Sequence, residues 1–289
     1  MKKNTNRHGP PRNPLKIVAI FAIVFLICCL IFGGVIAVMI KLGQEPEDVP
    51  DAAVVPAANP LNILIVGQDE GITGCLLVRL NYADGSVPVV SLPPELSLTA
   101  RGRTDTLKGH MVYGGINQVV AGVEETLAIN VDRYVMIGRS VLVNFIDRLG
   151  GIHYTLDRAV SYGNSPGEQT NTLQPGDHNL TGIMVAGLLM SSDAGRGAKD
   201  HMLTEVCVAL LNQYLTSGIL DRAEGLFENV IGQVQTNIGF ADLTISLLNS
   251  SALLEKDAPA YALQNNMDFS GNEVRLSQEK ISEIGQRFN

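Results

Sequence analysis

The stretch Val123–Ile152, which reads VEETLAINVDRYVMIGRSVLVNFIDRLGGI, decides the expected fold of this chain. It completes a helix predicted over Ile116–Ala128, where apolar residues recur at three- and four-residue intervals. A short β-rich run, Tyr134–Ile137, follows, and a second helix is predicted over Ser140–Leu149, ended by the glycine pair at Gly150. Strand and helix therefore alternate, and we expect a buried set on their inner faces: Val123, Leu127, Tyr134, Val141, Phe145 and Leu149.

Working outward, strands dominate before this stretch and helices after it. Leu61–Val66 and Cys75–Leu80 are apolar strand candidates, and Asp84-Gly85 is a hairpin signal before a third strand at Val87–Leu92. Pro93-Pro94 ends that strand, and a loop rich in Gly, Thr and Arg is expected next. The later segments are a strand at Ile152–Leu156 and helices at Thr181–Leu189, His201–Leu215, Glu224–Val234 and Leu243–Leu253. The prediction is one α/β domain over residues 61–289, with a central mixed sheet flanked by helices on both faces.

The N-terminal part has the pattern of a membrane anchor. Residues 1–16 hold five basic and no acidic side chains, which predicts a cytoplasmic tail, and residues 17–40 form a run of 24 without any charge. About 20 apolar residues span a bilayer as a helix, whereas the apolar part of a cleaved signal peptide has only about 7–15. A lipoprotein signal at Cys28 or Cys29 lacks the small-residue context. Residues 41–60, rich in Pro, Ala and acid, predict a stalk, which places the domain outside a cell membrane crossed once.

Charge limits the partners of that exterior domain. Residues 42–289 hold all 29 acidic and 15 of the 21 basic residues, a net charge of −14. Nucleic acid is therefore not an expected partner, because its binding depends on neutralised phosphates. Two cysteines, Cys75 and Cys207, lie in this part. They either form a disulfide in an oxidising space or are isolated core residues, and the sequence leaves both readings open.

Other sequence patterns carry little chemistry. The five histidines show no metal-ligand spacing, and the chain has no nucleophile elbow, Walker loop or dinucleotide-binding glycine pattern. Asp69 and Glu95 each follow a predicted strand. They are candidates for a paired cation site, although each is equally suited to capping a turn.

Several stretches, in order, resemble the LytR-CpsA-Psr family of envelope proteins. The opening stretch is similar to its helix, its Ile-x-Val-Asp-x-Tyr-Val strand and its Leu-Gly-Gly ending. The other similar stretches are NILIVGQD at Asn62–Asp69, MVYGGIN at Met111–Asn117, LQPGDHNLTG at Leu173–Gly182 and VQTNIGFADLTISL at Val234–Leu247. The resemblance implies a fold, an anchor and an activity: transfer of a glycopolymer from a polyprenyl-pyrophosphate carrier to peptidoglycan. Such phosphoryl transfer uses Mg²⁺ on carboxylates and guanidinium groups on the pyrophosphate.

The positions that the resemblance assigns to these charges are altered here. Asp69 matches the first metal-binding aspartate, and Glu95 keeps a carboxylate where the family has Pro-Arg-Asp, but Pro94 replaces the arginine. Thr73 stands for the second aspartate, and the two later arginines fall at Met190 and Ser192. The loss of these guanidiniums predicts weak or absent catalysis, since one preorganised charge contact contributes about 10²–10³ in rate.

Nearby basic residues are candidate replacements. We consider Arg103, Lys108 and Lys199 as phosphate contacts, with Asp69 and Glu95 as metal ligands. The competing interpretation is that the basic residues are simply solvated. Three functions therefore stay open: a transferase with rearranged charges, a non-catalytic protein that binds a lipid-linked or glycan ligand or acts as a scaffold, and an adhesion or sensing ectodomain.

Overall fold

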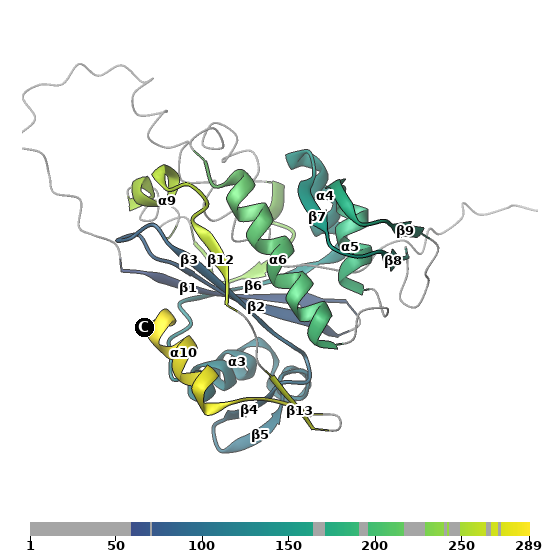
Figure 1. Ribbon diagram of the computed structural model, residues 1–289. Helices are drawn as coiled ribbons and strands as arrows, with labels where there is room; N and C mark the ends of the chain where they lie inside the picture. Colours follow the sequence, from purple (N-terminus) through teal and green to yellow (C-terminus); the bar gives the residue numbers. More distant parts are fainter. Residues whose placement is uncertain are drawn as a thin grey trace, which may run out of the picture.

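The centre of the molecule is a six-stranded sheet in the order β11-β6-β1-β2-β3-β12 (Figure 1). The computed structural model describes residues 59–69, 71–163, 171–190, 196–216, 229–239, 242, 249–263, 267–270 and 273–289. The sheet strands are β1 (Leu61–Gln68), β2 (Ile72–Leu80), β3 (Val87–Leu92), β6 (Arg133–Gly138), β11 (Gln235–Thr236) and β12 (Ala260–Ala262).

The sheet is mixed, as predicted. β1 and β3 each pair antiparallel with β2, whereas β6 pairs parallel with β1 and β12 parallel with β3. As a result β1, β3 and β6 run in the same direction and end together. We call the edge where they end the carboxyl edge of the sheet, and the opposite edge the amino edge.

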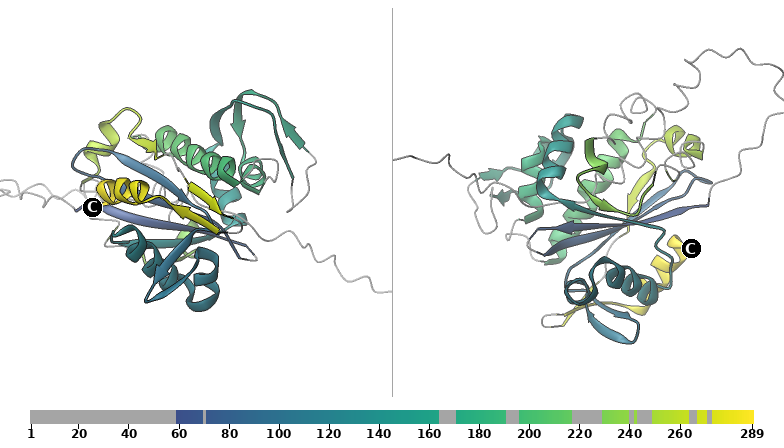
Figure 2. Two further views of the ribbon diagram at one scale, coloured as in Figure 1. Left: turned by 60° about the horizontal axis from the view of Figure 1, so that its bottom comes forward. Right: turned by 180° about the vertical axis from the view of Figure 1, so that it is seen from behind.

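Helices cover both faces of the sheet, which also agrees with the prediction (Figures 1 and 2). On one face lie α3 (Leu107–Leu127) and α10 (Gln278–Phe288). The other face carries α4 (Arg139–Leu149), α5 (Gly182–Met190), α6 (Arg196–Tyr214) and the short α9 (Ser251–Glu255). Of the six residues expected in the core, five are buried, and Tyr134 is half-buried against that core.

Four two-stranded ribbons surround this core. They pair β4 (Ser97–Ala100) with β5 (Arg103–Thr106), β7 (Ile152–Leu156) with β10 (Gly176–Leu180), β8 (Val160–Tyr162) with β9 (Asn171–Leu173), and β13 (Met267–Ser270) with β14 (Glu273–Leu276). The β4–β5 ribbon lies outside α3, on the side away from the sheet (Figure 1).

The expected loop after Pro94 is wrong. This segment forms β4, β5 and the first turns of α3, because Arg101 and Gly102 both take positive φ angles and close a hairpin. Helix α3 begins at Leu107, well before the predicted start, where the Thr106 side chain accepts a hydrogen bond from the Gly109 N–H. The helical path breaks at Gly114 and Gly115, and its second part follows the predicted segment.

The quoted Leu-Gly-Gly ending is held by contacts from distant parts of the chain. Gly151 has a φ of +94°, and a Cβ there would lie 2.6 Å from Oδ1 of Asn179 on β10. The Tyr214 hydroxyl, at the end of α6, lies 2.6 Å from the Gly151 carbonyl oxygen. Asp147 of α4 accepts a 2.8 Å hydrogen bond from the N–H of Gly182, where α5 begins. The matched stretches are therefore joined in space as one framework.

The structure decides between the two interpretations of the cysteines, whereas several predicted segments lie outside the residues that it describes. Cys75 and Cys207 are buried free thiols, so the isolated-core interpretation is the one the structure shows. Residues 17–40 lie outside the described residues, as do residues 224–228 and 243–248, the first parts of the helices expected at Glu224–Val234 and Leu243–Leu253. Within the described part, no helix is long and apolar enough to cross a membrane.

Candidate functional site

The carboxyl edge of the sheet gathers charged side chains from three strand ends. Gln68 and Gly138 are the last paired residues of the parallel β1 and β6. Asp69 and Arg139 come directly after them, so the two charged residues leave neighbouring strands side by side. Glu95 lies three residues past the end of β3, at the same edge. Ligands of α/β proteins bind at this edge, where the loops after the strands begin.

Asp69 and Arg139 are opposite charges that follow neighbouring strands at this edge. The Oδ1 atom of Asp69 is buried, and Arg139, the first residue of α4, is only 7% exposed. Burial lowers the pKa of the Arg139 guanidinium, and the nearby Asp69 carboxylate partly opposes that effect. The two charges therefore interact electrostatically inside a partly desolvated site, where such an interaction is stronger than in water.

A second pair of predicted residues meets at the corner between β3 and α3. The Lys108 N–H donates a 2.9 Å hydrogen bond to the Pro94 carbonyl oxygen, and the Glu95 carbonyl accepts one of 3.1 Å from Val274. These backbone contacts bring Glu95, which is half-buried, close in the fold to Lys108, which is exposed. Strand β2 lies between Glu95 and Asp69 in the sheet.

Arg103 lies elsewhere. It stands on β5, in the ribbon outside α3, where its guanidinium is ion-paired with Asp105 and 4.3 Å from the centre of the Tyr113 ring. Hydrogen bonding from Arg103 is the main reason that the pKa of Asp105 lies below its usual value. The structure thus does not bring Arg103 to the carboxyl edge with Asp69.

The start of α6 contributes a carboxylate that sequence reasoning passed over. Lys199 belongs to this helix, and its side chain lies outside the described residues. Its neighbour Asp200 is 7% exposed. Burial is the main reason that the pKa of the Cys75 thiol on β2 lies above its usual value, and the charge of Asp200 raises that pKa further. Arg139 was also missed. Both residues share a helical face with core residues three and seven positions later, which is the signal that marks them as buried charges.

The described residues do not by themselves supply a magnesium site. Among them, no three His, Cys, Asp or Glu side chains come close enough to share an ion. Mg²⁺ takes oxygen ligands in octahedral geometry. Asp69 and Glu95 follow strands separated by β2, and the charge next to Asp69 is a guanidinium.

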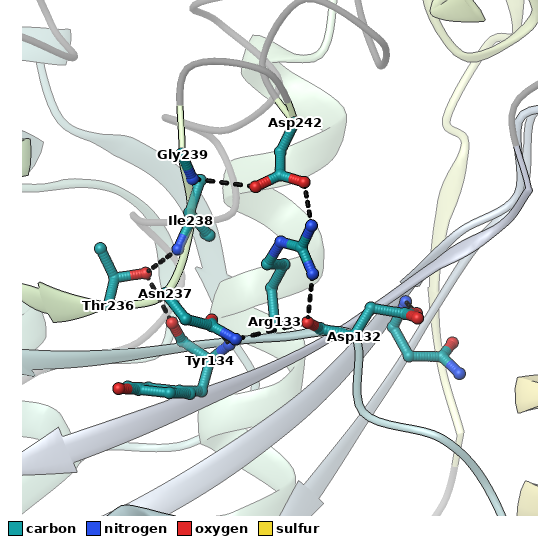
Figure 3. Close-up of polar contacts among 9 residues, drawn as sticks. Asp132, Arg133, Tyr134, Thr236, Asn237, Ile238, Gly239 and Asp242 are labelled. Atoms are coloured by element: carbon teal, nitrogen blue, oxygen red, sulfur yellow. Dashed lines mark hydrogen bonds and ion pairs between the residues drawn. The ribbon is translucent and has the colours of Figure 1, made fainter.

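The amino edge carries a different polar cluster, shown in Figure 3. Arg133 at the start of β6 is ion-paired with Asp242 and donates to the Asp132 carbonyl oxygen. Asn237 accepts a 2.8 Å hydrogen bond from the Tyr134 N–H. Burial opposes ionisation of Asp242, but Arg133 and the Gly239 N–H outweigh it, so the pKa of Asp242 lies below its usual value. These contacts tie β11 and the segment after it to β6.

Arg79 and Asn62 complete the amino edge beneath the end of α10. Both are less than a tenth exposed. Asn62 donates to the carbonyl oxygens of Asn130 and Phe288, and Arg79 donates to Asn62 Oδ1 and again to Phe288. These hydrogen bonds hold the end of α10 and the segment before β6 to β1 and β2, and we call this cluster the structural joint.

Comparison with known proteins places the chain. A model of the LytR_cpsA_psr family matches residues 40–286. Biofilm regulatory protein A of Streptococcus mutans is 23% identical over 86% of this chain and 70% of its own length. The polyisoprenyl-teichoic acid–peptidoglycan teichoic acid transferase TagU of Halalkalibacterium halodurans is 25% identical over 67% of this chain and 66% of its own.

A solved structure has the same fold. It is the LytR-CPS2A-psr family protein YwtF (TagT) with bound octaprenyl pyrophosphate lipid, with a TM-score of 0.58 and 19% identity over 84% of this chain and 92% of that one. At this identity the likeness shows the fold alone. Together with the family model, which spans most of the sequence, it leads to a plain conclusion: the chain belongs to the LytR-CpsA-Psr family.

Proposed function

We propose that this protein is a membrane-anchored, extracytoplasmic member of its family that binds a polyprenyl-pyrophosphate-linked glycopolymer at the carboxyl edge of the sheet. Catalysis of transfer to peptidoglycan is weak or absent. Two resemblances support the ligand class: the TagU relative is named as a teichoic acid transferase, and the TagT structure holds a polyprenyl pyrophosphate. The charge-free run at residues 17–40 supports attachment to the bilayer, with the basic tail inside.

The observation that carries the proposal is the meeting of Asp69, Glu95, Lys108 and Arg139 at one end of three strands. A pyrophosphate carries several negative charges and needs cations around it. In the described part of this edge, Arg139 and Lys108 supply them, one buried and one exposed. Lys108 is the exposed cation that can contact a headgroup, whereas the buried Arg139 acts at this edge through its charge.

Catalysis of the transfer reaction requires more than binding of the lipid-linked ligand. As charge develops on the leaving oxygens, a transition state is stabilised by guanidiniums that are already in place. Pro94, where the resemblance sets an arginine, has no side-chain donor. Arg103 is engaged by Asp105 on the far side of α3 and does not replace it. We therefore favour a binding protein with little transferase activity over an efficient enzyme.

The test measures binding and turnover separately. The full chain in lipid nanodiscs is incubated with octaprenyl pyrophosphate, with and without Mg²⁺, beside the TagU relative. We expect saturable binding that Asp69→Ala or Arg139→Gln weakens, and turnover at least about 100-fold slower than that of TagU. A rate close to that of TagU, abolished by Asp69→Ala, contradicts the catalytic part of the proposal. Absence of saturable binding contradicts all of it.

A further inference from the structure

The pairing of Asp69 with Arg139 raises the question of how this edge neutralises its carboxylate. Asp69 has a buried oxygen, and a buried carboxylate is costly unless a cation lies close to it. In a hydrolytic or transferase site a divalent metal ion often fills that role. Here the parallel register of β1 and β6 places Asp69 and Arg139 directly after the paired residues Gln68 and Gly138 on neighbouring strands, and the charge of Asp69 acts on the guanidinium.

Three features of Arg139 make it a permanent cation at this place. It is the first residue of α4, so its backbone is fixed between a paired strand and a helix. Its side chain is 7% exposed, so it is held in the protein and does not extend into water. A guanidinium also stays protonated at any accessible pH. A metal ion, by contrast, occupies its site only in proportion to its concentration.

We propose that Arg139 is the built-in countercation of Asp69 and takes the place that a divalent ion would otherwise fill, so that this edge is assembled without metal. The inference concerns the same edge as the proposed function. It assigns Arg139 a positioning role toward Asp69, and its consequence is that Mg²⁺ neither binds at Asp69 nor stabilises the wild-type chain. Removing the guanidinium exposes the carboxylate to solution cations and creates a weak divalent-ion site.

The experiment is a melting series that requires no lipid ligand. The full chain in detergent micelles is melted under far-UV circular dichroism, with about 10 mM MgCl₂ or with NaCl of equal ionic strength. The variants are Arg139→Gln, Arg139→Lys, Asp69→Asn and the neutral pair Asp69→Asn/Arg139→Gln. Arg148→Gln is the matched control, because Arg148 is an exposed arginine on the same helix.

We expect Mg²⁺ to leave the melting temperature of the wild type, the Lys variant and the control unchanged relative to NaCl. Arg139→Gln melts lower in NaCl and recovers by about 3 °C or more in MgCl₂. The neutral pair melts higher than Arg139→Gln alone and shows no effect of Mg²⁺. Because no lipid is present, these outcomes are independent of whether the proposed function holds.

Two results overturn the inference: an Arg139→Gln variant that folds and gains no Mg²⁺ response, or a wild-type response to Mg²⁺ that Asp69→Asn removes. Where Arg139→Gln does not fold, wild type and Asp69→Asn are titrated with Mn²⁺ and followed by electron paramagnetic resonance. Equal binding by the two supports the countercation, and binding that is lost in Asp69→Asn overturns it.

Discussion

The two edges of the central sheet differ in how their charged side chains are hydrogen-bonded. At the amino edge, Arg79 and Asn62 are buried and saturated with hydrogen bonds to carbonyl groups and to each other. At the carboxyl edge, backbone hydrogen bonds from Lys108 to Pro94 and from Val274 to Glu95 fix the corner after β3, and the charge of Asp69 acts on the buried Arg139 guanidinium. The difference shows which edge is held by internal hydrogen bonds, and it is the opposite edge that we propose as the ligand site.

The sharpest way to break the comparison is to remove Arg79. Arg79→Met removes the donor of the Asn289 carbonyl oxygen and of the Asn62 amide oxygen, and one of the two donors of the Phe288 carbonyl oxygen. We expect a loss of about 3 kcal/mol in the free energy of unfolding, because buried acceptors stay desolvated. Chemical denaturation of the full chain measures it, with Arg148→Met as the exposed control. A loss below about 1 kcal/mol means that the amino edge is not the structural joint described here.

The ion pair at the same edge predicts a pH dependence. The folded-state pKa of Asp242 lies below its unfolded value, because Arg133 and Gly239 outweigh the effect of burial. Its contribution to stability is thus complete above the unfolded pKa of about 4 and is lost as the pH falls through the folded value. Melting temperatures of wild type and Asp242→Asn should differ at pH 7 and converge as the pH drops below about 4. A difference that stays constant down to pH 3 goes against the ion pair.

The smallest effect on stability is expected at the carboxyl edge. Lys108 is exposed, and its side chain makes no hydrogen bond among the contacts described for it. Lys108→Ala should change the free energy of unfolding by less than about 0.5 kcal/mol while weakening polyprenyl-pyrophosphate binding. Denaturation and binding are measured on the same preparation. A variant that loses stability and keeps its affinity would reverse the roles assigned to the two edges.

Most strands and helices of the fold could be predicted from the sequence because they depend on the spacing of nearby residues. Hydrophobic spacing gave the strands and helices around Val123–Ile152, and Gly150 and Gly151 do end a helix, with positive φ angles. The hairpin and helix start between Ser97 and Leu107 were missed because an αL turn at Arg101 and a Thr106 cap carry weak sequence signals. The small strands near the C-terminus are too short to show periodicity.

Only some residues of the candidate site could be predicted from the sequence. The family resemblance pointed to Asp69 and Glu95, and both follow strands that end at the carboxyl edge. The charge of Arg103 and its sequence neighbours suggested a phosphate contact, but it lies on β5, where it contacts Asp105 and the Tyr113 ring. Arg139 was overlooked because a charge within an amphipathic helix reads as solvated unless its face is checked against the core. The charge of a residue does not by itself predict where the fold places it.

The most direct test of the account asks where the ligand touches the chain. A photoactivatable polyprenyl-pyrophosphate analogue, labelled at the headgroup, is bound to the full chain in nanodiscs, and the modified peptides are identified by mass spectrometry. The account predicts labelling around Asp69, around Pro94–Lys108 and around Arg139, and its suppression by unlabelled octaprenyl pyrophosphate. Labelling at Asn62, Arg133 or Asn237 on the amino edge, or labelling that the unlabelled lipid does not suppress, would contradict it.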